Sequence, residues 1–232
     1  ATLVSNENVS ALSKNVAVAI GRTTQDGFSL SVSKNSLQNK VDGDSATINV
    51  MLRDRTGNPV PNGTIVSFVS EGGVVTPNCS TTDGRCLVTL SVQNPRPLDN
   101  RVTVLAYVEG DKDYIDKDGD NQFSAGDIFT HNIGDFFRDD NENNKYDSEA
   151  GEFVYRRGAT GAVCAPSSNS QPNIADTCNN KLSAILRQQF ILGLASDSPV
   201  YEGLPGSLNP NLGKTAITRA FKMYGNSART VS

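Results

Sequence analysis

The stretch DKDGDNQFSAGD, residues 116–127, holds the side chains of this chain that are best suited to chemistry. Asp116, Asp118 and Asp120 alternate along it, and Asp127 closes it. Alternate side chains of a loop can turn inward together, and calcium takes about six to eight oxygen ligands in a flexible geometry. The spacing therefore predicts a calcium ligand set. The alternative is a solvated acidic loop, because surface loops rich in aspartate and glycine are common.

The order of residue types matches the calcium loop of an EF-hand, which draws its ligands from positions 1, 3, 5, 7 and 12. The three alternating aspartates stand at the first three of these positions, Gln122 offers its carbonyl at the fourth, and Asp127 is the last. Phe123 follows Gln122, where an apolar anchor is expected. Asn121 replaces the usual glycine, since asparagine tolerates positive φ. The flanking segments lack the pattern of EF-hand helices, so the sequence predicts the loop without the helices.

A second copy, DDNENNKYDSEAGE, occupies residues 139–152. Alignment of its tyrosine with Phe123 places Asp139, Asn141 and Asn143 at the first three ligand positions, and Lys145 would contribute only its carbonyl. The closing acid, Glu152, comes two residues late. Fewer charges and an insertion predict a weaker site.

A shorter repeat links the two copies. GDIF, GDFF and GEFV each read glycine, acid and two apolar residues, which gives Asp127, Asp135 and Glu152 parallel roles as ligands. This repetition favours calcium over a solvated loop, and magnesium is less suited because it rarely uses all-protein cages. The predicted ligands are Asp116, Asp118, Asp120, Gln122, Asp127, Asp135, Asp139, Asn141, Asn143, Lys145 and Glu152.

The four cysteines fall in two local pairs, Cys79 with Cys86 and Cys164 with Cys178. Neither pair has the spacing of a zinc site. An even number of cysteines in local pairs predicts two disulfides and an oxidising, extracellular compartment, against the alternative of four free thiols. The first disulfide is expected to join the two strands of a hairpin.

Charge is concentrated in one part of the chain. The formal net charge is −4, yet residues 109–152 contain 14 acidic and 4 basic side chains. Local acidity indicates bound cations, and no basic patch for nucleic acid is evident.

No run of 18 apolar residues occurs, so the sequence offers no transmembrane segment. A single histidine, His131, and the lack of nucleophile, phosphate-loop or zinc motifs predict that the chain is not an enzyme.

Apolar and polar residues alternate in short runs through the first half of the chain, as in residues 28–32, 48–52, 66–68, 88–92 and 102–108. Turn residues separate these runs, for example in RDRTGNPVPNG and NPRPLDN. Such strands, each with one face in a core and one in water, predict an all-β fold of the β-sandwich type.

Residues 25–108 resemble the bacterial immunoglobulin-like repeats of the invasin and intimin type. The segments GNPVPNGTIVSF and STTDGR carry the resemblance, through Asp54, Gly57, Asn58, Pro59, Val60, Pro61, Gly63, Thr64, Val66, Phe68, Thr82, Asp83 and Gly84. The acidic segment is also similar to calcium-loop insertions of the form D-x-N-G-N-G…D-x-G-E in large bacterial surface proteins. The resemblance implies an immunoglobulin-like β-sandwich in an exported, multi-domain fibre.

This family implies a structural role in adhesion or cell-surface contact, for a protein that is secreted or anchored to the bacterial surface. The implied partners are neighbouring immunoglobulin-like modules of the same chain and a host or bacterial cell-surface protein or glycan. The alternative function is an accessory module that binds carbohydrate or protein through its loops. Tyr107, Tyr114, Tyr155 and Tyr201 are the candidate contacts for a glycan.

Five segments follow from these patterns. Residues 1–24 are predicted as an N-terminal strand or the end of a preceding module, and residues 25–108 as the sandwich. Residues 109–157 form the acidic calcium-binding insertion. Residues 158–195 form a disulfide loop and a returning strand, although the periodicity of 182–190 fits a helix equally. Residues 196–232 are a linker or the start of the next module.

Overall fold

The computed structural model describes residues 2–3, 6–10, 21–130, 133–156, 164, 168, 170–196, 199–203 and 220–225. Strands dominate these residues, and the one helical element among them is a short 3-10 turn, η1 (Ser148–Ala150). The predicted all-β fold is confirmed. The alternating residues 16–20 of the predicted N-terminal strand, His131, and residues 204–219 and 226–232 of the predicted linker lie outside the described residues.

Nine strands form a hydrogen-bonded set that folds into two layers. They are β3 (Thr23–Val32), β4 (Ser36–Gln38), β5 (Ser45–Asp54), β6 (Ile65–Ser70), β7 (Val74–Val75), β8 (Asn78–Ser80), β9 (Arg85–Ser91), β10 (Arg101–Asp111) and β15 (Ser183–Ala195). One layer has the order β3-β5-β9-β7, and the other has the order β4-β15-β10-β6-β8. A bridge between Asp111 and Thr24 joins β10 to β3. The β-sandwich prediction is confirmed.

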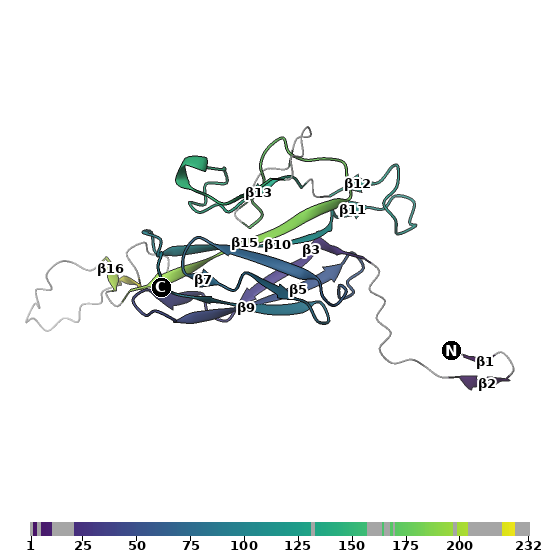
Figure 1. Ribbon diagram of the computed structural model, residues 1–232, viewed down its shortest axis with the longest axis horizontal. Helices are drawn as coiled ribbons and strands as arrows, with labels where there is room; N and C mark the ends of the chain where they lie inside the picture. The colour runs from purple at the N-terminus through teal and green to yellow at the C-terminus, as the bar shows by residue number, and fades with distance from the viewer. Residues whose placement is uncertain are drawn as a thin grey trace, which may run out of the picture.

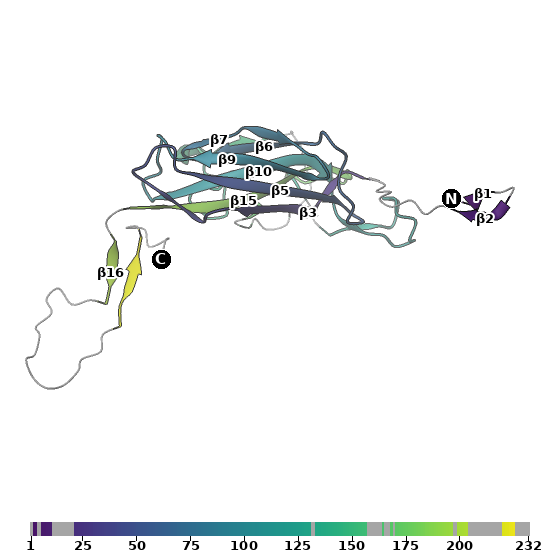
Figure 2. The same cartoon turned by 90° about the horizontal axis from the view of Figure 1, so that it is seen from below.

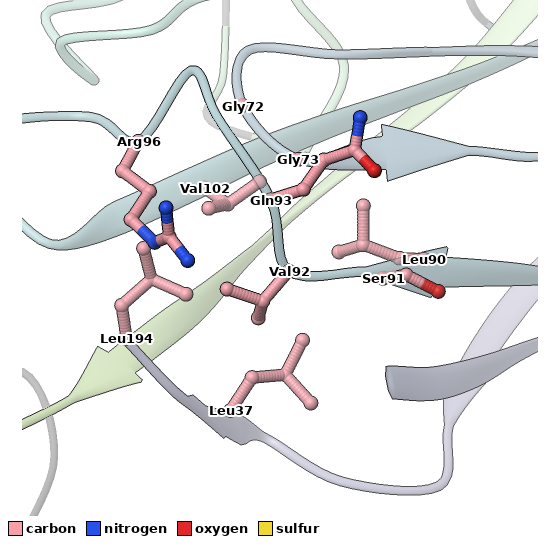
Figure 3. Close-up of a pocket in the computed structure, with 10 residues that line it drawn as sticks. All are labelled: Leu37, Gly72, Gly73, Leu90, Ser91, Val92, Gln93, Arg96, Val102 and Leu194. Atoms are coloured by element: carbon pink, nitrogen blue, oxygen red, sulfur yellow. The ribbon is translucent and has the colours of Figure 1, made fainter. Parts of the chain in front are cut away.

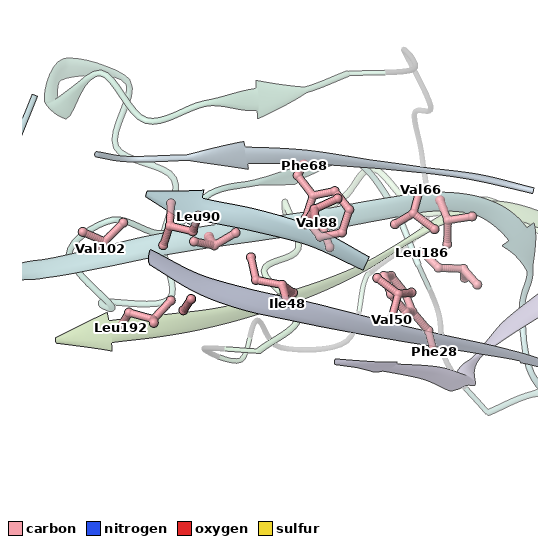
Figure 4. Close-up of a cluster of buried hydrophobic side chains, with 14 of the residues drawn as sticks. Phe28, Ile48, Val50, Val66, Phe68, Val88, Leu90, Val102, Leu186 and Leu192 are labelled. Carbon is pink, nitrogen blue, oxygen red and sulfur yellow. The ribbon is translucent and has the colours of Figure 1, made fainter. Parts of the chain in front are cut away.

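The core lies between the two layers, as Figure 4 shows. Phe28, Ile48 and Leu90 enter it from one layer, and Phe68 and Leu186 enter it from the other, all of them at most 3% exposed. Their alternation in the sequence is what the pleat of a strand requires, because successive side chains point to opposite faces. Burial of each such side chain stabilises the fold by about 1.5–3 kcal/mol.

The geometry of the turn after β5 explains why the GNPVPNG motif has these residue types. One carboxylate oxygen of Asp54 accepts hydrogen bonds from the main-chain N–H groups of Thr56 and Asn58, at 3.0 and 2.8 Å. Gly57 and Gly84 both have positive φ. At Gly84 a Cβ atom would also lie 2.5 Å from the carbonyl oxygen of Leu52, so this close approach of two chains needs glycine.

Strands β10 and β15 are antiparallel neighbours over eleven residue pairs, from Arg101 with Gly193 to Asp111 with Ser183. Residues 112–182 therefore leave one end of a long hairpin and return to it. The N–H of Lys112 donates to the carbonyl of Leu182 at 2.8 Å and closes the base. Residues 182–190, whose periodicity fits helix and strand equally, lie almost wholly in strand β15, because this segment completes the layer.

We call residues 112–182 the excursion. It lies along the outer face of β10 and β15, above the sandwich in Figure 1, and Figure 2 shows the sandwich from below. Its elements are β11 (Tyr114–Ile115), β12 (Ile128–Phe129), β13 (Phe136–Phe137), η1 and β14 (Val154–Tyr155). Leu105, Phe136 and Ile185 form a second buried cluster between the excursion and the sheet. This explains why β10 is buried at consecutive positions, since apolar contacts cover both of its faces.

Two further strand pairs lie outside the sandwich: β1 (Thr2–Leu3) with β2 (Asn6–Ser10), and β16 (Val200–Glu202) with β17 (Lys222–Tyr224). Within the described residues, no helix is long and apolar enough to cross a membrane.

Candidate functional site

The first acidic loop, residues 116–127, brings its alternating carboxylates together. Oxygen atoms of Asp116, Asp118 and Asp120 all lie within 4.8 Å of one another. The carboxylate of Asp116 also fixes the backbone, because it accepts the N–H groups of Gly119 and Asn121 at 2.7 and 2.8 Å. Asn121 has a φ of 62°, which matches the expectation that it replaces glycine in a left-handed position.

Asp127 closes the loop from the other end. Its two carboxylate oxygens accept the N–H groups of Lys117 and Ser124 at 2.9 and 2.7 Å. The hydroxyl of Ser124 donates to Asp118 at 3.3 Å. The closing acid thus binds both ends of the loop and keeps them close to the three converging carboxylates.

A two-stranded ribbon holds the first loop. Tyr114 and Phe129 face each other where β11 pairs with β12, and Phe123 packs on both rings, with centroids 5.3 and 4.4 Å away. Phe123 is therefore the anchor that its place in the sequence predicts. On the other face, the cross-strand pair Ile115 and Ile128 is about half exposed.

The second acidic loop, residues 139–152, repeats this geometry 23 residues later. The carboxylate of Asp139 accepts the N–H groups of Asn143 and Asn144 at 3.1 and 2.8 Å, and Asn144, like Asn121, has a φ of 62°. The side-chain oxygen of Asn141 accepts the N–H of Asn143 at 3.1 Å. The predicted register of the two copies therefore agrees with their backbone geometry.

Glu152 takes the place of Asp127 in the second loop. It accepts the N–H groups of Asp140 and Asp147 at 3.1 and 2.7 Å, which are the counterparts of Lys117 and Ser124. The two extra residues before Glu152 are absorbed by η1, which is capped by Gly151 with a φ of 77°. Because of this turn, the late position of Glu152 in the sequence does not displace its carboxylate.

A second ribbon carries this loop. Phe137 faces Val154 where β13 pairs with β14, and Tyr146 packs on Phe137 with the ring centroids 5.8 Å apart. The aromatic residue inside each loop thus contacts the first strand of its own ribbon.

The residues at the seventh position act through their main chains. The N–H of Gln122 donates to Asp120, and the N–H of Lys145 donates to Asn143, each at 2.7 Å. Both residues are exposed. Their carbonyls remain the predicted ligand atoms.

Asp135, predicted as a ligand, lies in neither loop. It is buried beside the disulfide segment, where its N–H donates to the hydroxyl of Thr177 at 2.9 Å and its carbonyl accepts the N–H of Ile174 at 2.8 Å. Burial lowers the pKa of Arg187 to about 9, and the charge of Asp135 acts in the opposite direction. The structure therefore places Asp135 near a buried guanidinium, apart from the other ten predicted ligands.

Asp147 is a residue that the sequence reasoning missed. Its carboxylate accepts the side-chain N–H groups of Asn141 and Asn143 at 2.9 and 2.5 Å. These two hydrogen bonds lower the pKa of Asp147, and burial only partly opposes them. The signal was present in the spacing, since Asp147 stands eight residues after Asp139, where the first loop has Ser124 eight residues after Asp116.

The two loops differ in their electrostatics. In the first, burial raises the pKa of Asp116, but the hydrogen bonds from Asn121 and Gly119 outweigh it and the pKa is lowered. In the second, burial dominates and raises the pKa of both Asp139 and Glu152. The first loop therefore keeps Asp116 ionised more readily, which suits a cation ligand.

Each loop is fastened to the sandwich. Arg55, in the turn after β5, lies 3.7 Å from the carboxylate of Asp116, and its guanidinium stacks over the ring of Tyr114 at 4.2 Å. In the second loop, the side chain of Gln189 accepts the N–H of Asp139 at 2.9 Å and donates to its carbonyl at 3.0 Å. The loops are thus parts of the folded domain.

Both predicted disulfides are confirmed. Cys79 bonds to Cys86 and Cys164 to Cys178, with Cα–Cα distances of 5.9 and 5.3 Å. The expectation that the first disulfide joins the strands of a hairpin is wrong, since β8 hydrogen-bonds to β6 while β9 pairs with β5 and β7. The disulfide instead connects the two layers of the sandwich.

The tyrosines considered for glycan binding are mostly packed. Tyr107 and Tyr155 lie against Phe136, with centroids 5.5 and 5.0 Å away, and Tyr114 packs on the anchor of the first loop. Tyr201 is about half exposed on β16. A cavity at one end of the core has a volume of only about 10 Å³ and is lined mainly by Leu37, Leu90, Val92, Val102 and Leu194 (Figure 3), which is room for about one water.

Comparison of the chain with protein-family models, with curated proteins and with solved structures found no match.

Proposed function

We propose that this chain is a calcium-stabilised immunoglobulin-like module of a secreted or surface-anchored bacterial multi-domain protein. The observation that carries the proposal is the convergence of the carboxylates of Asp116, Asp118 and Asp120 within 4.8 Å. Like charges at this distance repel one another. A divalent cation between the three carboxylates attracts each of them and so offsets this repulsion. With Asp127 and the carbonyl of Gln122, the first loop offers the oxygen donors that calcium prefers.

The role of the ion in this proposal is structural. The first loop has few apolar side chains and consists largely of charged and polar residues, so it buries little surface that would order it. An ion that binds only the folded loop stabilises it by mass action. Extracellular calcium is millimolar, and the calcium sites of extracellular modules are often weak enough to match it.

Two further observations support the extracellular location and the structural role in this proposal. The two disulfides are typical of an oxidising compartment. The resemblance of residues 25–108 to immunoglobulin-like repeats of the invasin and intimin type supports a structural role in adhesion or cell-surface contact. Neighbouring modules of the same chain and a cell-surface protein or glycan are the partners in this proposal.

The proposal predicts that calcium raises the melting temperature and that the first loop carries this effect. Asp118→Ala with Asp120→Ala removes two of the converging carboxylates, so it should lower the melting temperature by several degrees in about 2 mM calcium, and change it little in chelator. Thermal melts followed by circular dichroism measure both conditions.

The control is the double variant Asp83→Ala with Asp99→Ala, which removes the same number of charges from turns outside both loops. Equal melting curves for the wild type in calcium and in chelator would refute the proposal. A rise of the same size in magnesium would show a general effect of divalent charge in place of a calcium site.

A further inference from the structure

The two loops differ in chemistry at three equivalent positions. The first has Asp118, Asp120 and Ser124 where the second has Asn141, Asn143 and Asp147. These six residues set the difference in ligand chemistry between the loops. The backbone hydrogen bonds of the two loops are otherwise similar. Asp116 and Asp139 each accept two main-chain N–H groups, of which those of Asn121 and Asn144 are equivalent, while Asp127 and Glu152 close the loops in the same way. The loops therefore provide a matched pair in which the ligand positions vary on a common frame.

In the second loop, amide groups stand where the first loop presents negative charge. The side-chain N–H groups of Asn141 and Asn143 both donate to one oxygen of Asp147, at 2.9 and 2.5 Å. Their side-chain oxygens accept the main-chain N–H groups of Asn143 and Lys145, at 3.1 and 2.7 Å. Both ends of each carboxamide are thus used inside the loop, and Asp147 has two donors.

The first loop has no equivalent internal donors among its described contacts. The oxygens of Asp118 and Asp120 accept main-chain N–H groups at 3.3 and 2.7 Å, and one further bond comes from the hydroxyl of Ser124. A hydroxyl offers one donor, whereas two carboxamides offer four. Ionised carboxylates have no hydrogen-bond donor, so positive charge from another group or from an ion has to offset their mutual repulsion.

The second loop is also held more firmly by the sheet. Asp139 is fully buried, and Gln189 binds both its N–H and its carbonyl. Glu142, in the middle of the loop, forms an ion pair with Arg101 at the start of β10. These contacts fix the start and the middle of the loop without any ion.

We infer that the second loop is a metal-independent replica of the first, in which the carboxamides of Asn141 and Asn143 take over the role that calcium has in the first loop. The assignment of calcium to the first loop rests on the proposed function; the self-sufficiency of the second loop does not. The residues that decide between the two kinds of loop are those at the three equivalent positions. One calcium ion per chain is the expected stoichiometry.

Calorimetric titration of the intact chain with calcium, combined with amide hydrogen exchange, tests the inference. The N–H groups of Asn121 and Asn144 report on the two loops, because each donates to the first aspartate of its own loop. The wild type should bind one ion. In chelator, the Asn144 amide should stay protected while the Asn121 amide exchanges at least about tenfold faster than it does in calcium.

Exchanging the three positions supplies matched variants. N141D/N143D/D147S gives the second loop the residues of the first, so it should bind a second ion and lose the protection of Asn144 in chelator. D118N/D120N/S124D gives the first loop the residues of the second, so it should bind no ion and protect Asn121 in chelator. Wild-type measurements alone remain decisive if a variant fails to fold.

The outcomes separate the inference from the proposed function. Two ions per wild-type chain, with Asn144 protected only in calcium, would overturn the inference and leave the proposed function intact. No bound ion, with Asn144 protected in chelator, would overturn the proposed function and support the self-sufficient second loop. No protection of either amide in either condition would overturn both.

Discussion

Arg55 places a positive charge beside the first loop although it belongs to the turn after β5. Its guanidinium contacts the carboxylate of Asp116 and stacks on Tyr114. Its positive charge offsets part of the repulsion among the loop carboxylates when no cation is bound. Calcium at the proposed site and Arg55 would therefore both interact with Asp116. The stabilisation measured on adding calcium is then the gain from the ion over what Arg55 already provides.

Glu71 lies at the other end of the sheet, after β6, and is half-buried. One of its carboxylate oxygens accepts the N–H of Thr103 at 3.2 Å. Burial raises its pKa to about 7, and the hydrogen bond from Thr103 opposes this, while the charge of Asp140 adds to it. Between its ordinary pKa and about 7, folded Glu71 holds a proton that the unfolded chain has already released. Stability from this group is therefore lost as the pH rises through about 7.

Glu71→Gln should remove this pH dependence, because glutamine keeps the acceptor oxygen but never ionises. At pH 8 the variant should be more stable than the wild type by on the order of 1 kcal/mol, since solvent screening reduces the full effect at a half-buried site. At pH 4.5 and below the two should be equal. Urea unfolding in chelator at both pH values measures the difference, and a variant that is less stable at pH 8 would contradict it.

At the scale of elements, each acidic loop and its ribbon form one unit. The ribbon fixes the two ends of the loop, the internal aromatic residue packs on the ribbon, and the closing acid binds the backbone near both ends. Two-stranded ribbons are marginally stable alone. The second unit therefore depends on the outer face of β10 and β15, where Gln189 binds Asp139, and the first unit depends on Arg55 in the turn after β5.

Gln189→Leu should detach the second loop from the sheet. The variant leaves the N–H and the carbonyl of buried Asp139 without their partners, which costs about 2–4 kcal/mol in unfolding free energy. Chemical denaturation measures the loss, and amide exchange should show it first in residues 139–147. The control is Gln188→Leu, whose carboxamide makes a single bond, to the carbonyl of Phe28, and is half-buried. A larger loss for the control would refute the role of Gln189.

Local spacing was enough to predict the alternating strands of the first half, the two loops and the roles of Phe123 and Asn121, because these depend on near neighbours in the sequence. It left β15 open between helix and strand. Contacts between distant segments were not predictable in the same way. Asp135 shares a four-residue pattern with Asp127, but its segment packs against the disulfide loop some 40 residues later. Similarly, the partner of Cys79 follows from proximity in the sequence, whereas its location across two layers follows from strand pairing.

At the scale of the whole molecule, the chain forms three layers: two sheets of a sandwich and the excursion that covers one of them (Figure 1). The long hairpin of β10 and β15 is shared by the two cores, one facing the sandwich and one facing the excursion. The first loop contacts the turn after β5, where Arg55 pairs with Asp116, so calcium bound there would stiffen the domain through that turn. The sandwich itself has a complete core of its own.

Replacing residues 112–182 by the two-residue turn Asn-Gly should leave a folded sandwich, because Asp111 and Ser183 already face each other and this turn suits a hairpin. The deletion uncovers Leu105 and Ile185, which should cost about 3–6 kcal/mol. The melting temperature should no longer respond to calcium. A matched variant with both uncovered residues changed to threonine keeps the sandwich soluble. If circular dichroism shows no strand structure in either variant, the excursion is part of the folding core and the three-layer division is wrong.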